Sequence, residues 1–289
     1  MVNNSPASHV DWSYSTARLY HKCPRQFYYQ HRQREEKDTG YETQSSTAVQ
    51  PPGARIGSVV HDCIAEKIEH WRNSSKRTLQ DSQEAAAASL QQYVAENSDE
   101  IRDSHFTDED EFDPDEFAQS LIQTAQSHIK TFFQVIWPQF NSHRYITHEI
   151  TRSFSVDEHT VWVRPDFCTR SQEGDLVITD WKTGAVDRFS EPTLQVLTYA
   201  LWAHREYEPD LDRILVQLVH TKHGEFDRTR PDRVDLDSIK NQIRTDREDW
   251  TTFQSMNDYQ PDPETEKCKY CTFLDRCDAG QMCIDKGPD

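Results

Sequence analysis

Hydrophobic and polar residues alternate along two short segments, 161–170 and 176–182, which are rich in β-branched and aromatic side chains. A polar stretch that contains Gly174 separates them. Strand-like alternation on both sides of a glycine-containing turn predicts an antiparallel hairpin. A turn centred on the polar stretch places the carboxylates of Asp166 and Asp180 opposite each other, which is unfavourable on a sheet unless a cation lies between them.

Apolar residues recur every three to four positions in the segments around this hairpin, which predicts helices. The predicted helices lie at 14–29, 56–71, 79–97, 117–137, 192–202 and 236–256, further strands at 145–154 and 214–220, and loops at 35–54 and 98–116. Helices and strands mixed along one chain predict an α/β fold. The stretch 66–140 is then a mostly helical insertion ahead of the strands.

The charge is strongly negative, with 50 acidic residues against 32 basic ones and a net charge of −18. An acid excess with few lysines is typical of proteins from salt-adapted cells, and an ordinary acidic protein is the alternative. The exception is the stretch 12–34, which has no acid and interleaves basic and aromatic residues. Such a stretch fits a phosphate backbone and stacked bases, or else a half-buried helix with a solvated basic side.

No apolar run is long enough to span a membrane, and the N-terminal residues are too polar for a signal peptide. We therefore expect a cytoplasmic protein without a membrane partner. Seven cysteines in such a compartment do not predict a disulfide framework.

The opposed aspartates predict a divalent metal site. Mg²⁺ or Mn²⁺ prefers oxygen ligands, which Asp166, Asp180 and the backbone carbonyl of Trp181 supply. Lys182 lies on the same strand face as Asp180 and is placed to hold a water or to steady charge on a phosphate. Because metal-bound water is a strong nucleophile at neutral pH, these residues indicate phosphodiester hydrolysis.

The text Pro165-Asp166 followed by Asp180-Trp181-Lys182 resembles the PD-(D/E)XK nuclease superfamily, and Thr-Asp-Trp-Lys-Thr-Gly is similar to its RecB-type branch. The resemblance implies a restriction-endonuclease-like core, a central mixed sheet flanked by helices, in a single domain over residues 1–289. It also implies three further site residues. His61 would be a third metal ligand, and Gln195 and Tyr199 would orient Lys182 or the DNA.

The cysteine spacing also resembles a family feature. Cys268-x2-Cys271-x5-Cys277, with Cys23 before Pro24, is similar to the iron–sulfur clasp of RecB-like nucleases, which include the CRISPR-associated Cas-four family and the AddB nuclease domain. The resemblance implies a [4Fe–4S] cluster and a segment, 262–285, that closes onto Cys23. A local four-thiolate zinc site in which Cys283 replaces Cys23 is the alternative.

These features predict a metal-dependent DNA nuclease, an exonuclease that prefers single strands or single-stranded ends. It would serve DNA repair and recombination or CRISPR spacer acquisition, with a helicase or a CRISPR integrase as partner. Asp180 stands where Cas-four families often have Glu, which favours a RecB-like protein. The alternatives are a non-catalytic nucleic-acid-binding scaffold and a zinc or iron–sulfur regulatory module on the same fold.

Overall fold

The computed structural model describes residues 10–32, 50–106, 111–184, 193–208, 210–253, 255–269 and 271–286. The chain forms two compact units. The terminal unit consists of residues 1–48, 152–163 and 237–289, and the sheet unit consists of residues 49–151 and 164–236. The single domain over 1–289 stays a prediction, and most of the predicted loop at 35–54 lies outside the described residues.

The sheet unit contains a five-stranded mixed sheet in the order β2-β5-β6-β7-β8. Its strands are Arg144–His148 (β2), Phe167–Arg170 (β5), Leu176–Lys182 (β6), Ile214–His220 (β7) and Glu225–Thr229 (β8). β6 and β7 are parallel, and every other pair is antiparallel. Phe167 pairs with Thr179, which is the predicted register of the hairpin and places Asp166 across from Asp180.

The first strand of the predicted hairpin is shorter than expected. The alternation from 161 onward is interrupted at Pro165, which has no amide hydrogen to donate to a ladder. β5 therefore begins at Phe167, and the residues before the interruption belong to β4 (His159–Val163) of the terminal unit.

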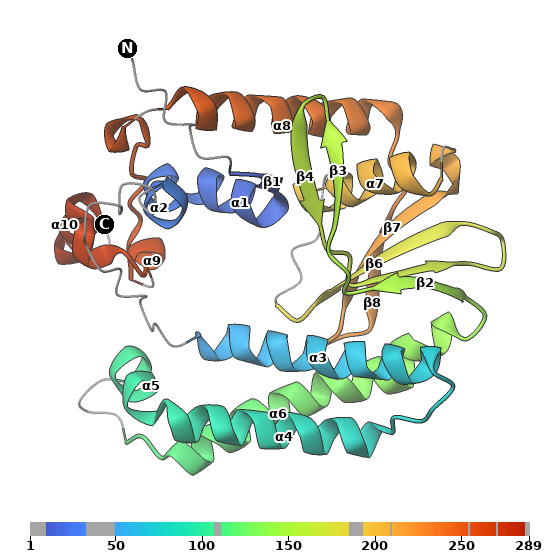
Figure 1. Cartoon of the computed structure of the whole chain (residues 1–289). Helices are drawn as coiled ribbons and strands as arrows, with labels where there is room; N and C mark the ends of the chain where they lie inside the picture. Colours follow the sequence, from blue (N-terminus) through green and yellow to red (C-terminus); the bar gives the residue numbers. More distant parts are fainter. Residues whose placement is uncertain are drawn as a thin grey trace. The chain divides into compact units, whose positions relative to one another are not determined.

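The helix that carries His61 and the helices of the predicted insertion at 66–140 cover one face of this sheet (Figure 1). They are α3 (Pro52–Arg72), α4 (Leu79–Glu96), α5 (Ser98–His105) and α6 (Pro114–Thr131), followed by the short turns η3 (Phe132–Ile136) and η4 (Trp137–Phe140). Ile64, Leu90 and Ile129 of the long helices share one buried core with Phe167 and Trp181 of the sheet. The burial of their apolar faces stabilises these helices, because isolated helices are only marginally stable in water.

The predicted loop at 98–116 is wrong in its first part, because α5 forms there. Asp99 and Glu100 lie in the first turn, where negative charge interacts favourably with the helix dipole, and Ile101 is buried. The acidic composition thus marks a helix N-terminus rather than a loop.

The opposite sheet face is covered by α7 (Leu194–Glu206), which lies between β6 and β7 in sequence. Thr193 caps this helix by accepting a hydrogen bond from the Val196 amide. Pro192, predicted to open the helix, lies outside the described residues, as does the rest of the segment 185–192. A short turn, η5 (Leu211–Arg213), leads into β7.

The terminal unit is built from both ends of the chain and one internal hairpin. Its elements are β1 (Trp12–Ser13), α1 (Tyr14–Lys22), α2 (Pro24–Phe27), η1 (Tyr28–Arg32), β3 (Arg152–Val156), β4, α8 (Arg233–Thr252, whose first turn belongs to the sheet unit), η6 (Met256–Asp258), α9 (Thr265–Cys268), η7 (Leu274–Arg276) and α10 (Asp278–Lys286). β1, β4 and β3 form a separate three-stranded sheet. The single strand predicted at 145–154 is therefore wrong, because β2 and β3 lie in different sheets.

The aromatic residues near the N-terminus form a core. Phe27 is fully buried and its ring lies 4.8 Å from that of Trp250 and 5.9 Å from that of Tyr259. Tyr20, Tyr28 and Tyr29 are all less than 9% exposed. The expectation that these aromatic residues stack on bases is wrong for the four buried ones, and the half-buried helical arrangement is the one found, divided among α1, α2 and η1.

Among the residues that the structure describes, no helix combines the length and the apolar character that crossing a membrane requires.

Candidate active site

Two buried carboxylates face each other where β5 starts and β6 ends. Asp166 directly precedes β5 and Asp180 lies in β6, and the residues are only 9% and 3% exposed. Asp166 Oδ2 accepts a 2.7 Å hydrogen bond from the amide of Trp181. Burial, and next the charge of Asp180, raises the pKa of Asp166 well above its ordinary value. The pair therefore favours a proton or a cation at this point.

Lys182, Gln195 and Tyr199 surround Asp180 with a hydrogen-bonded network. Lys182 Nζ lies 2.6 Å from Asp180 Oδ2 and donates to Gln195 Oε1 at 2.7 Å. The side-chain amide nitrogen of Gln195, Nε2, donates to Asp180 Oδ1 at 2.9 Å. The Tyr199 hydroxyl donates to the backbone carbonyl of Arg164 at 3.1 Å. Gln195 and Tyr199 lie one turn apart on one face of α7. Both side chains point at the carboxylate, so α7 fixes the geometry of the Asp–Lys pair.

His61 reaches the same carboxylates from α3. Its Nε2 lies 3.0 Å from the carbonyl oxygen of Trp181, and its Nδ1 lies 3.6 Å from Asp166 Oδ2. Burial lowers the pKa of His61, which favours the neutral imidazole that metals bind. α3 comes this close to the end of β6 because Gly57 has no side chain. A Cβ there would lie 3.0 Å from Thr183 Oγ1.

Glu149 is a site residue that the sequence reasoning missed. It directly follows β2, has a φ of 50°, and donates its amide hydrogen to the carbonyl of Pro165 at 3.1 Å. Its carboxylate pairs with Arg164 Nε at 2.9 Å, and burial raises its pKa. Ligand atoms of His61, Glu149 and Asp166 all lie within 4.8 Å of one another. The sequence signal, a lone Glu inside an expected strand, is too weak to have found it.

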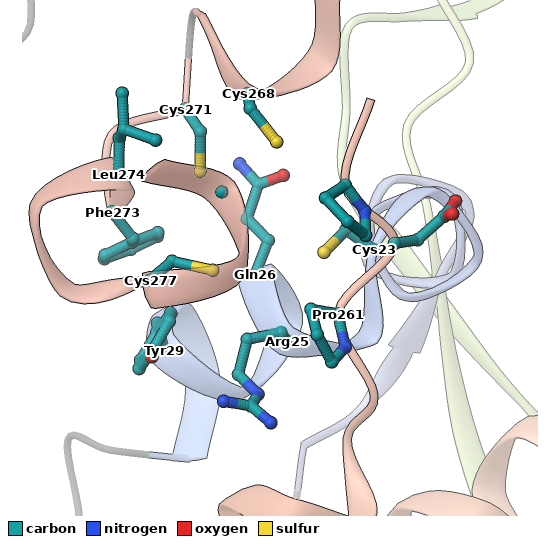
Figure 2. Close-up of a pocket in the computed structure, with 13 residues that line it drawn as sticks. Cys23, Arg25, Gln26, Tyr29, Pro261, Cys268, Cys271, Phe273, Leu274 and Cys277 are labelled. Carbon is teal, nitrogen blue, oxygen red and sulfur yellow. The ribbon is translucent and has the colours of Figure 1, made fainter. Parts of the chain in front are cut away.

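The cysteines near the two ends of the chain meet in the terminal unit. Cys23 precedes α2, and Cys268, Cys271 and Cys277 come from the C-terminal segment, yet all four line one pocket. Figure 2 shows their sulfurs directed toward a common space, with the side chain of Gln26 among them. Cys23 and the three cysteines of the C-terminal segment therefore lie around one pocket, and the closure of this segment by a cluster stays a prediction.

The pocket fits a compact thiolate-bound group. At Gly280, a Cβ would lie 3.1 Å from a methyl carbon of Leu274 and 3.5 and 3.6 Å from the sulfurs of Cys277 and Cys268. Glycine therefore keeps space beside two of the sulfurs. Partial burial raises the pKa of Cys271 and of Cys268, so these half-buried thiols resist ionisation unless a metal binds them.

Cys283 lies near this group without lining the pocket. Its sulfur is 3.9 Å from the Thr265 hydroxyl, and its charge is among those that raise the pKa of Cys268. The local zinc site with Cys283 therefore remains the alternative to the site that includes Cys23.

The family model described as the PD-(D/E)XK nuclease superfamily matches residues 11–278 of the chain. The chain belongs to the PD-(D/E)XK nuclease superfamily. No curated protein matches it. Among solved structures, one titled "Crystal structure of SSO0001" is similar, with 15% identity and a TM-score of 0.30 over 78% of this chain and 96% of that chain. That similarity is weak, and the family assignment does not depend on it.

Membership in the PD-(D/E)XK superfamily indicates a metal-dependent nuclease, and the donor set of this chain fits a divalent ion. His61, Glu149 and Asp166 offer one imidazole nitrogen and two carboxylate oxygens within 4.8 Å of one another, and these residues could hold such an ion. Asp180 lies close enough to raise the pKa of Asp166, and it adds negative charge that a divalent ion would balance.

Proposed function

We propose that this member of the superfamily is a Mg²⁺- or Mn²⁺-dependent deoxyribonuclease, an exonuclease that acts on single strands or single-stranded ends. The observation that carries the proposal is the pair of buried aspartates with Lys182 Nζ 2.6 Å from Asp180. Such a group of charges is costly for folding alone and suited to holding a metal and a phosphate.

The residues divide the work of phosphodiester hydrolysis. His61, Asp166, Asp180 and the Trp181 carbonyl would hold the ion, with Glu149 close enough to join them. The bound ion supplies Lewis acidity toward the phosphate and lowers the pKa of a bound water. Lys182 stabilises negative charge that develops on the phosphate oxygens. Its position is fixed because Gln195 accepts one of its hydrogens.

We further propose that Cys23, Cys268, Cys271 and Cys277 hold a [4Fe–4S] cluster. The support is the pocket that all four line and the space that Gly280 leaves beside two sulfurs. The cluster would tie the N- and C-terminal segments together. We propose a structural role for the cluster because it would join these two segments.

The preference for DNA ends and the role in repair, recombination or CRISPR spacer acquisition, with a helicase or integrase partner, are supported by the RecB-like form of the motifs. Asp180 in place of Glu favours the repair role. The N-terminal aromatic residues add no support for single strands, because they are buried.

A nuclease assay on end-labelled single- and double-stranded DNA with Mg²⁺ or Mn²⁺ tests the proposal. We expect Asp180→Asn and Lys182→Gln to lower cleavage at least about 100-fold, since each removes charge that acts on the transition state. Asp175→Asn is the matched control, because Asp175 is also ion-paired to basic residues but lies at the other end of the hairpin. Wild-type cleavage by Asp180→Asn would refute the assignment, and binding without cleavage by the wild type would favour the scaffold.

A further inference from the structure

The carbonyl group of Lys182 is held by two donors from one residue. The amide of Thr221 donates to it at 2.9 Å and the Thr221 hydroxyl donates to it at 3.1 Å. Lys182 is the last residue of β6, where its ladder with β7 ends opposite His220. Without these bonds the final residue of a strand would be free to fray, and here that residue carries the lysine of the site.

The hydroxyl of Thr221 is itself held by a buried histidine. His128 Nδ1 lies 2.8 Å from Thr221 Oγ1, and the two residues are 3% and 0% exposed. A hydroxyl has one hydrogen, and in this contact it points to the Lys182 carbonyl. His128 must then donate from Nδ1, which requires the tautomer with hydrogen on that nitrogen. Burial lowers the pKa of His128 and keeps the ring neutral.

The turn between β7 and β8, which contains Thr221, also packs closely against the helical insertion. Gly224, in the same turn between β7 and β8, has a φ of 71°. A Cβ there would lie 2.9 Å from a methyl carbon of Val135 and 3.3 Å from one of Thr131. Both neighbours follow His128 on the same run of helix and turn, so the contact between the insertion and the turn extends beyond one hydrogen bond.

We propose that the helical insertion positions the lysine of the active site: His128 on α6 orients the Thr221 hydroxyl, which fixes the Lys182 carbonyl at the end of β6. His128 and Thr221 are positioning residues, since neither reaches the carboxylates. The inference deepens the proposed nuclease function and rests on it for its effect on rate, whereas the contact itself can be tested separately.

The chain offers a matched control for this arrangement. His143 Nδ1 lies 2.8 Å from Thr169 Oγ1, and Thr169 is also fully buried. Thr169 lies in β5 and pairs with Val177, five residues before Lys182. The two His–Thr pairs thus have the same chemistry and the same length, but only one of them leads to the lysine.

The test compares Thr221→Val, Thr221→Ser and His128→Leu with Thr169→Val in the full chain. Valine keeps the volume and the backbone amide of Thr221 and removes only the hydroxyl. With Mn²⁺ and end-labelled DNA, we expect Thr221→Val and His128→Leu each to lower the rate at saturating DNA about tenfold, since small misplacements of a catalytic group are costly. KM and the Mn²⁺ affinity should not change, because the metal ligands are untouched.

Two further readouts separate positioning from general damage. Thr221→Ser should restore the rate, and the double variant Thr221→Val/His128→Leu should be no slower than either single variant, because both remove one chain of contacts. Thr169→Val should stay within about twofold of the wild type. A rate for Thr221→Val within that range, or an equal loss in Thr169→Val, overturns the inference.

Amide hydrogen exchange tests the contact between Thr221 and the Lys182 carbonyl even if the protein shows no nuclease activity. The protection of the amide of residue 221, relative to its intrinsic exchange rate, should be lower in Thr221→Val and His128→Leu than in the wild type, and unchanged in Thr169→Val. Unchanged exchange at Thr221 overturns the inference whatever the activity. If the wild type cuts no DNA but the exchange changes as expected, the proposed nuclease function fails and the link from α6 to Lys182 stands.

Discussion

At the scale of single residues, the site brings acidic groups together at low exposure. Asp166, Asp180 and Glu149 are all partly or fully buried, and burial raises the pKa of Asp166 and of Glu149. Lys182 and Arg164 offset part of this charge through ion pairs. The remaining negative charge is what a divalent ion would bind.

Glu149→Gln should weaken Mn²⁺ binding about tenfold, a typical effect for a group at the edge of a metal site, and calorimetric titration would measure it. Glu208→Gln is the control, because Glu208 pairs with Arg170 at 2.9 Å just as Glu149 pairs with Arg164. Equal Mn²⁺ affinity in Glu149→Gln and the wild type would restrict Glu149 to a structural ion pair.

The raised pKa of Asp166 and of Glu149 predicts a pH dependence of stability. A folded pKa above the unfolded value adds stability that is complete below the ordinary carboxyl pKa of about 4 and is lost as pH rises through the folded value. The free energy of unfolding of the metal-free protein should therefore fall as pH rises above about 4. Saturating Mn²⁺ should remove this fall, because the ion replaces the protons.

Denaturant unfolding at several pH values, with and without Mn²⁺, makes this comparison. If the free energy of unfolding of the metal-free protein does not change as pH rises above about 4, the charge of the buried carboxylates is already balanced by basic groups of the protein.

At the scale of elements, the site depends on where helices and strands end. α3 supplies His61, the end of β6 supplies Asp180 and Lys182, and α7 supplies Gln195, and each residue acts through its position at an element boundary or on one helix face. The same principle holds for the cysteines, since Cys23 lies between α1 and α2 and Cys277 lies directly before α10.

Substitution of single cysteines separates the two metal sites that the sequence allows. Cys23→Ser should abolish the broad absorption near about 400 nm expected for a thiolate-bound iron–sulfur cluster and lower the bound iron, whereas Cys283→Ser should keep both. A colourless wild-type protein whose bound zinc persists in Cys23→Ser and is lost in Cys283→Ser would favour the local site of Cys268, Cys271, Cys277 and Cys283.

At the scale of the whole molecule, the net charge of −18 opposes both folding and the approach of DNA. The Debye length falls from about 10 Å at 0.1 M salt to about 3 Å at 1 M. Concentrated salt would therefore relieve the repulsion between carboxylates on the surface. The proposal that the protein is adapted to high salt rests on its excess of acidic residues, whose mutual repulsion salt would screen.

The melting temperature should rise by several degrees between 0.1 and 2 M KCl, as scanning calorimetry would measure. The same increase in salt should have a smaller effect at pH 5, where protonation of most of the 13 histidines lowers the net negative charge. This comparison separates screening of charge from general effects of salt on the burial of apolar groups. A melting temperature that falls with salt at neutral pH would exclude salt adaptation.

The family was expected from the resemblance of the motifs and is confirmed by the family model. The sequence by itself was enough for the β5–β6 register and for the group of Asp166, Asp180 and Lys182. These depend on local rules: strand alternation, a short turn, and the spacing of two residues on one face. His61, Gln195 and Tyr199 were expected only because of the resemblance to the RecB-type branch, and in the structure they lie around the same carboxylates.

Only the tertiary structure decided the contacts between distant segments. Glu149 joins the site because β2 pairs with β5. His128 contacts the Thr221 hydroxyl because α6 lies beside the β7–β8 turn. The N-terminal aromatic residues are buried because α8 covers them. Each depends on which partner a segment finds, and the periodicity of a segment reports which face is apolar without identifying what will bury it.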